Sequence, residues 1–103
     1  MPQYMYVLKP VRPGMLAEGP TPAEERIVGE HFAHLQALVA RGVVHLAART
    51  LTTGPETMGI CILTAADEAA ARGYVQSDPA VAENVMTAEL FPCRVALWGR
   101  EPA

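Results

Sequence analysis

The sequence predicts an α+β fold of the ferredoxin-like βαββαβ type, with a four-stranded antiparallel sheet and both helices on one of its faces. Three features predict it. Runs of β-branched and aromatic residues alternate with two segments of helical periodicity, in the order strand, helix, strand, strand, helix, strand. The 103 residues suit one domain, and 50% of them are apolar whereas only 18% are charged. A proline inside the last strand fits the edge position that this topology gives that strand.

The first strand and the first helix are predicted by composition and capping. Residues 3–9 are rich in aromatic and β-branched side chains, and the segment PGMLAEGP after them is expected to be a loop. Thr21-Pro22-Ala23-Glu24 forms a capping box, and Gly42 is placed to end a helix, which we therefore expect over residues 22–41. The apolar residues of this helix recur every three or four positions and predict one face against the sheet: Ile27, Val28, Phe32, Leu35, Leu38 and Val39.

The middle of the chain predicts a hairpin and a second helix. Residues 43–51 and 58–64 are predicted strands, and the turn-rich sequence TTGPE joins them. Asp67 is placed to cap a helix that ends near residue 76. Pro79 then prevents continuation, because its ring clashes with the turn behind it, and a short helical turn, PAVAEN, is expected to follow.

The last strand, expected over residues 86–98, is apolar on both of its alternating faces, and the predicted strand 58–64 repeats this pattern. A sheet with one face in water alternates apolar and polar residues instead. An exposed apolar face of this size is typical of an interface. We therefore expect the second face of the sheet to pack on another copy of the chain, in a homodimer. The alternative is a monomer whose C-terminal tail covers that face.

Charge and motif content exclude several classes of function. The formal net charge is −3, and the basic residues are scattered, so no basic stripe is present to bind nucleic acid. No dinucleotide, Walker, nucleophile-elbow or zinc-protease motif occurs. Cys61 and Cys93 lack metal-ligand spacing and stand in apolar runs, so free buried thiols are expected, with no metal and no cofactor. Without a leader pattern or a membrane-length apolar run, the expected location is cytoplasmic.

Five polar residues remain as candidates for a site. His31 lies on the apolar face of the first helix, where it is either a hydrogen-bonded core histidine or a general acid–base. His34 lies one turn further, toward the helix flank, and His45 in the second strand is interpreted as structural. Asp78 fits the cap of the short helical turn and would also orient an imidazole in a dyad. Arg49 either binds an anionic substrate or pairs with a surface carboxylate.

Four segments carry a resemblance to a known family: MYVLKPVRPG, GEHFAHLQALVARGVVHLAARTL, MGICILTAADEAAARGYVQSDPAV and TAELFPCRVALW. Their order and spacing resemble the YCII-related (YciI-like) family across nearly the whole chain. The resemblance assigns residues 1–99 to a YCII-related domain and leaves residues 100–103 as a C-terminal tail. It implies a ferredoxin-like subunit of a dimeric α/β barrel, related to the barrel enzymes that include muconolactone isomerases.

The resemblance also implies a site. In the family, a helix histidine before a leucine-rich stretch and an aspartate in a DP pair after the second helix are proposed to form an active-site dyad, and those positions match His31 and Asp78. The family histidine is often followed directly by leucine. Here Phe32 follows His31 and a second histidine stands at His34, so both registers stay open. Most members have no settled reaction, and one branch similar to the family removes chloride from a chlorinated hydroxyquinol.

Three classes of function are therefore carried forward. The first is a cofactor-free lyase or isomerase, dehydrochlorinase-like in one variant, that acts on a small polar metabolite, aromatic or lactone-like, in a cleft between helix and sheet. In it His31 moves a proton, Asp78 orients His31, and Arg49 holds a negative group. The second is a noncatalytic module for ligand binding or protein interaction. The third is a structural subunit of a larger complex.

Overall fold

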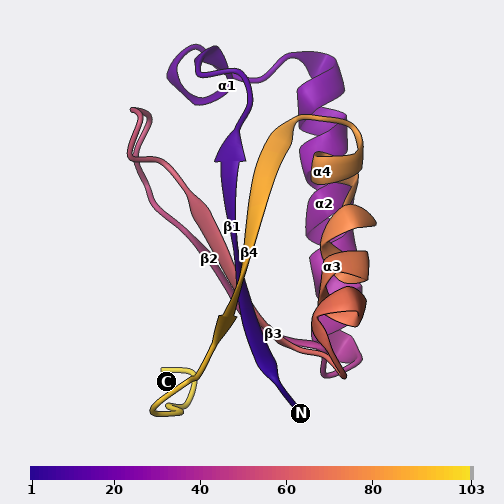
Figure 1. Cartoon of the computed structure of the whole chain (residues 1–103). Coiled ribbons are helices and arrows are strands. Elements are labelled where there is room, and N and C mark those ends of the chain that lie inside the picture. Colours follow the sequence, from indigo (N-terminus) through magenta and orange to yellow (C-terminus); the bar gives the residue numbers. More distant parts are fainter. Residues whose placement is uncertain (103) are drawn as a thin grey trace.

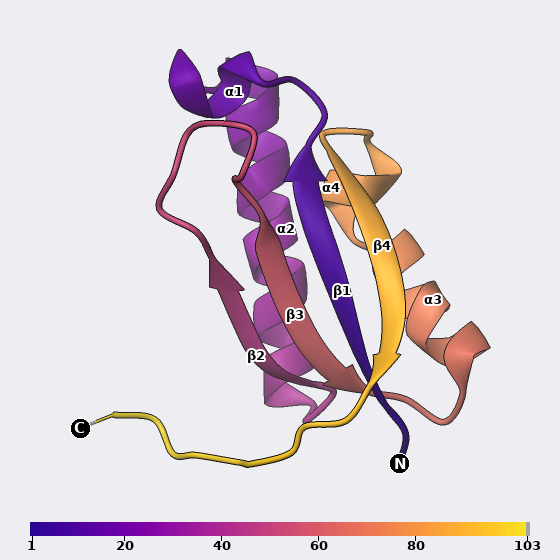
Figure 2. The same cartoon turned by 60° about the vertical axis from the view of Figure 1, so that its left-hand side comes forward.

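The computed structural model describes residues 1–102 and contains one four-stranded antiparallel sheet with helices on one face (Figure 1 and Figure 2). The predicted ferredoxin-like α+β fold is thereby confirmed. The central strand β1 pairs with β3 on one side and with β4 on the other, and β2 and β4 form the two edges. The strands are β1 (Gln3–Pro10), β2 (Val44–Arg49), β3 (Gly59–Thr64) and β4 (Met86–Cys93).

Three helices, α2, α3 and α4, stack on the same side of the sheet, as Figure 1 shows, and the short α1 lies at the end where β1 finishes. Thr21 caps α2 in a complete capping box: its Oγ1 accepts from the backbone N–H of Glu24 at 3.2 Å, and its own N–H donates to Glu24 Oε1 at 2.8 Å. Gly42, with φ of 74°, allows the chain to turn after α2. The helices are α1 (Gly14–Ala17), α2 (Pro22–Ala40), α3 (Glu68–Gln76) and α4 (Pro79–Ala82).

The helix α1 lies in a segment expected to be a loop. One helical turn forms there because it buries Met15, which is 3% exposed and packs in a small cluster with Ile27 of α2. The backbone N–H of Glu18 donates to Gly14 O at 2.8 Å and closes the turn. A single turn has too few residues to show a helical period in the sequence, so local patterning does not reveal it.

The main core lies between the sheet and the helices. Alternate residues of β1 and β3 face it, and Tyr6, Cys61 and Leu63 are each at most 1% exposed. The prediction that Phe32 and Val39 of α2 also face the sheet is wrong, since they are 61% and 53% exposed. The apolar stripe of α2 is wider than its contact with the sheet, and these two side chains extend along the β2 edge, where they line surface hollows.

The last strand is shorter than predicted, because β4 ends at Cys93 rather than near residue 98. Cys93 is opposite Gln3, the first residue of β1, so the partner strand ends at this point. Residues 94–102 then cross below the sheet toward β2 (Figure 2). Trp98 there meets His45 edge-on, with ring centroids 5.3 Å apart. The last residue of the predicted 100–103 tail lies outside the described residues.

The second face of the sheet carries an apolar patch, as the alternation predicted, and the polar residues Lys9 and Glu89 lie on the same face. Its residues are paired across the strands, with Ile62 of β3 opposite both Met5 and Leu46. Leu46 is 53% exposed and Phe91 of β4 is 41% exposed. Within residues 1–102, no helix is both long and apolar enough to cross a membrane.

Candidate functional site

A cleft of about 560 Å³ opens between α2 and the sheet, beside the β2–β3 hairpin. Its size is in the usual range for small-ligand pockets. Most of the lining is apolar and includes three methionines, Met15, Met58 and Met86. The polar side chains on its walls are His31 and Glu25 from α2, Arg49 from β2, and Thr57 before β3.

His31 and Asp78 meet beside this cleft. His31 Nδ1 is 2.7 Å from Asp78 Oδ2 and 2.8 Å from Oδ1. A carboxylate only accepts hydrogen bonds, so Nδ1 carries a proton and donates it, and in the neutral form of the ring Nε2 has a free lone pair. The His31 side chain is 13% exposed and lines the cleft, and the Asp78 side chain is fully buried. The arrangement can therefore accept a proton from a bound ligand at Nε2.

Asp78 is held by donors from three separate elements. Besides His31 of α2, the hydroxyl of Tyr6 in β1 donates to Oδ2 at 3.2 Å, and the backbone N–H of Ala80 in α4 donates to Oδ1 at 3.0 Å. The last contact is the N-cap that the sequence predicted, with Pro79 as the first helical residue. A buried carboxylate needs such donors to offset the loss of water. The fixed position of Asp78 thus results from the break between α3 and α4.

Two buried side chains next to Asp78 stay protonated. Burial raises the pKa of the Tyr6 phenol well above its usual range, with further contributions from Cys61 and Asp78. Burial, with a smaller contribution from Asp78, raises the pKa of the Cys61 thiol to about 11. Tyr6 is therefore a donor at neutral pH, and Cys61 is not a thiolate nucleophile. Strand alternation predicts the face on which Tyr6 lies but not its contact with Asp78, which is 72 residues away in the sequence, so no sequence pattern marks Tyr6 as part of a site.

The other two histidines lie elsewhere. His34 is near α3, with its Nε2 3.2 Å from the carbonyl oxygen of Tyr74, so it donates across the two helices. His45 is exposed on the second face of the sheet, at an irregularity in β2, with Nε2 3.1 Å from Thr64 Oγ1. Of the two registers left open, only the one with His31 brings the histidine to Asp78 and the cleft.

Arg49, at the end of β2, lines the same cleft on the sheet side. No carboxylate among residues 1–102 forms an ion pair with it, so the pairing interpretation has no support in this part of the chain. The loop after Arg49 is braced by hydroxyl contacts, with Thr52 Oγ1 at 2.8 Å from both Thr50 Oγ1 and Thr57 Oγ1. These contacts fix the hairpin wall of the cleft.

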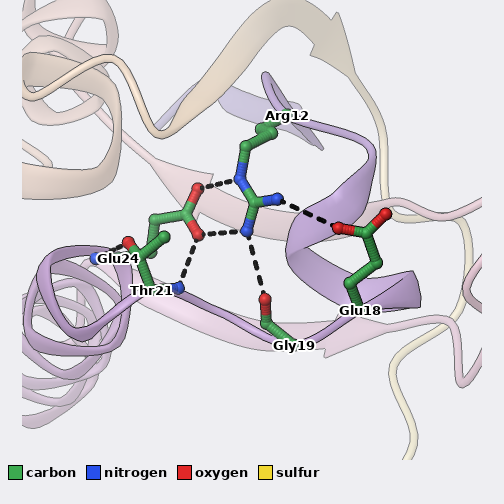
Figure 3. A network of polar contacts seen from close by, with 5 residues as sticks. All are labelled: Arg12, Glu18, Gly19, Thr21 and Glu24. Atoms are coloured by element: carbon green, nitrogen blue, oxygen red, sulfur yellow. Dashed lines mark hydrogen bonds and ion pairs between the residues drawn. The ribbon is translucent and has the colours of Figure 1, made fainter.

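A second polar network holds the α1 end of the cleft (Figure 3). Arg12 binds Glu24 through both carboxylate oxygens, at 3.0 and 2.7 Å, and also donates to Gly19 O at 3.1 Å. The hydrogen bond from Arg12, aided by the backbone N–H of Thr21, lowers the pKa of Glu24 to about 2. The ion pair between Arg12 and Glu24 is therefore charged on both sides at neutral pH. It holds in place the segment between β1 and α2, in which Met15 and Leu16 form part of the cleft wall.

Three comparisons with known proteins bear on the family and the fold. A family model for the YCII-related domain matches residues 4–92. No curated protein matches the sequence. Among solved structures, the 5-chloro-2-hydroxyhydroquinone dehydrochlorinase of Burkholderia phenoliruptrix AC1100, in complex with 2,5-dihydroxybenzoquinone, is similar with a TM-score of 0.64. The match covers 88% of this chain and 93% of that chain at 18% identity, a level of likeness that shows the fold.

Proposed function

The chain belongs to the YCII-related family, and we propose that it is a small-molecule enzyme in which His31 transfers protons and Asp78 orients and stabilises His31. One observation carries the proposal: the imidazole that lines the cleft has its Nδ1–H bound to a fully buried carboxylate at 2.7 Å. This arrangement prepares Nε2 as a base, and the Asp78 carboxylate stabilises the imidazolium that forms when Nε2 takes a proton.

The chemistry that fits this dyad is a cofactor-free elimination or isomerisation. His31 Nε2 removes a proton from the ligand, and the electron pair of the broken bond either expels a leaving group or shifts within the ligand. In an isomerisation, His31 then returns the proton at another atom. A dehydrochlorination is such an elimination, and its occurrence in a protein of similar fold supports lyase chemistry for this chain. Both proton transfers use His31, which lines the cleft.

The lining of the cleft suits a small polar metabolite with a flat ring, aromatic or lactone-like. Thioether sulfur makes favourable contacts with aromatic rings. Three methionines line the cleft and could contact such a ring: Met15, Met58 and Met86. Arg49 supplies a cation for a negative group such as an ionised hydroxyl or a carboxylate. The dihydroxybenzoquinone bound by the similar structure is a ring of this kind and supports the choice.

A ligand panel tests the proposed function. Thermal unfolding is measured with hydroxyquinones, phenols and small lactones, including 2,5-dihydroxybenzoquinone, and each binder is then followed for turnover. A ligand at 100 times its Kd stabilises the folded state by about 2.7 kcal/mol, enough to raise the Tm of a domain of this size by about 10 °C or more. We expect at least one ring compound to bind and to be converted.

The alternatives give other results in the same panel. Ligands that bind wild type and His31→Ala equally and are never converted would support a noncatalytic binding module. A chain that binds no panel member but is recovered in a stoichiometric complex with another protein would support a structural subunit. Either result contradicts the enzymatic proposal.

The apolar patch on the second face of the sheet supports a homodimer, which forms part of the same proposal. Exposed apolar area of this kind is stabilised by packing on a second copy. Ile62 lies at its centre between Met5 and Leu46. We expect Ile62→Glu to convert a dimer into a monomer, because it places an unpaired charge in the interface. Sedimentation measures this.

The control for the dimer test is Ala33→Glu, which adds the same charge to the exposed side of α2 and should leave the dimer intact. A wild-type chain that sediments as a monomer at tens of micromolar, a concentration at which standard-size interfaces persist, would overturn the dimer.

A further inference from the structure

Tyr6 has a buried hydroxyl that donates a hydrogen bond to Asp78 and takes no part in the proposed proton transfer. The phenol oxygen lies 3.2 Å from Asp78 Oδ2, the same oxygen that is 2.7 Å from His31 Nδ1. Tyr6 is 1% exposed and is not among the described residues that line the cleft. Tyr6 therefore contacts Asp78 on the side away from the cleft and is not in a position to contact a ligand there.

We propose that Tyr6 is a positioning residue, whose hydroxyl locks the Asp78 carboxylate so that His31 keeps its proton on Nδ1 and presents an unprotonated Nε2 to the cleft. This inference rests on the proposed function, because it concerns how His31 is prepared to accept a proton.

The geometry around the carboxylate carries the inference. The terminal torsion of an aspartate is soft, so a carboxylate held by one donor rotates easily. Here each oxygen has its own fixed donor, Ala80 N–H on Oδ1 and the Tyr6 hydroxyl on Oδ2. His31 Nδ1 is nearly equidistant from the two oxygens, at 2.8 and 2.7 Å. Rotation of the carboxylate would break both flanking bonds, and so the plane that faces the imidazole is fixed.

Tyr6 is itself held rigidly. It stands in the central strand, opposite Cys61 of β3 on one side and Leu90 of β4 on the other. Burial keeps the phenol protonated at neutral pH, so its hydroxyl remains available to donate to Asp78. A donor of this kind orients the carboxylate permanently and exchanges no proton with the ligand.

The test compares Tyr6→Phe with Tyr4→Phe in the ligand-free protein. Tyr4 is two residues earlier on the same strand face, is 6% exposed, and its hydroxyl does not bind Asp78 within the described residues. The readout is the tautomer of His31, measured from the nitrogen chemical shifts of the imidazole by NMR. We expect Tyr6→Phe to raise the ratio of the Nε2–H to the Nδ1–H tautomer about fivefold, the effect of one hydrogen bond, and Tyr4→Phe to leave it unchanged.

A purely structural role for Tyr6 predicts another result: both variants lower the Tm, and neither moves the tautomer ratio. That result overturns the inference but leaves the proposed function standing, because no turnover is measured. If Tyr6→Phe does not fold, the nuclear Overhauser effect between the Tyr6 hydroxyl proton and the His31 Nδ1 proton is measured in the wild-type protein. An observed effect supports the inference that both protons are donated to the same Asp78 oxygen. A Tyr6 hydroxyl proton that exchanges freely with water overturns the inference.

Discussion

Asp78→Ala is expected to lower the free energy of unfolding by about 4 kcal/mol, a large fraction of the stability of a domain of this size. The substitution leaves three donors without an acceptor: the Tyr6 hydroxyl, the backbone N–H of Ala80 and His31 Nδ1–H. A buried donor that loses its partner costs about 1–3 kcal/mol. Urea unfolding measures the effect, as a fall in the midpoint at a constant slope.

Asp67→Ala is the matched control for this stability test. Asp67 caps α3 as Asp78 caps α4, and its Oδ1 accepts from the backbone N–H of Ala70 at 2.8 Å. Asp67 is exposed and is not bound to a histidine or a tyrosine in the described residues, so its loss should cost only the ordinary capping energy of about 1 kcal/mol. Equal losses for the two variants would mean that Asp78 is no more than a helix cap.

The contrast between these aspartates shows how far sequence alone reaches. Both caps were predicted, because a cap and the helix it begins are neighbours in the chain. The fold was predicted for the same reason, since strand alternation and helical period are local patterns. The bond from Tyr6 to Asp78 was not, because it depends on where a strand and a helical break meet after the whole chain has folded.

The end of β4 and the exposure of two α2 side chains differ from the sequence predictions for a similar reason. The apolar run after Cys93 has the composition of a strand, but a ladder needs a partner, and β1 begins at Gln3. Phe32 and Val39 fit the helical stripe, but the width of the contact between α2 and the sheet is a tertiary property. The contact between His31 and Asp78 was suggested by family resemblance. Local sequence patterns place His31 on the first long helix and Asp78 at the start of the short helical turn, but they do not predict the distance between the two side chains.

His31→Gln is expected to lower kcat about a thousandfold on whichever panel compound the wild type converts, since general acid–base groups contribute about 10²–10⁴. Glutamine retains a polar side chain near Asp78 but has no basic nitrogen to accept a proton. The other cleft residues, Arg49 and the methionines among them, remain in place, so KM should change little. A loss confined to kcat indicates a group that acts in the transition state rather than in binding.

His34→Gln provides the matched comparison, one turn along the same helix. His34 donates to Tyr74 O, and its replacement should cost about 1 kcal/mol of stability while kcat stays within about threefold of the wild-type value. Unfolding curves for both variants establish that the fold persists. If His34→Gln abolishes turnover while His31→Gln retains it, the dyad is assigned to the wrong histidine. If both variants turn over at the wild-type rate, a bond of 2.7 Å between an imidazole and a buried carboxylate serves only to join α2 to the start of α4.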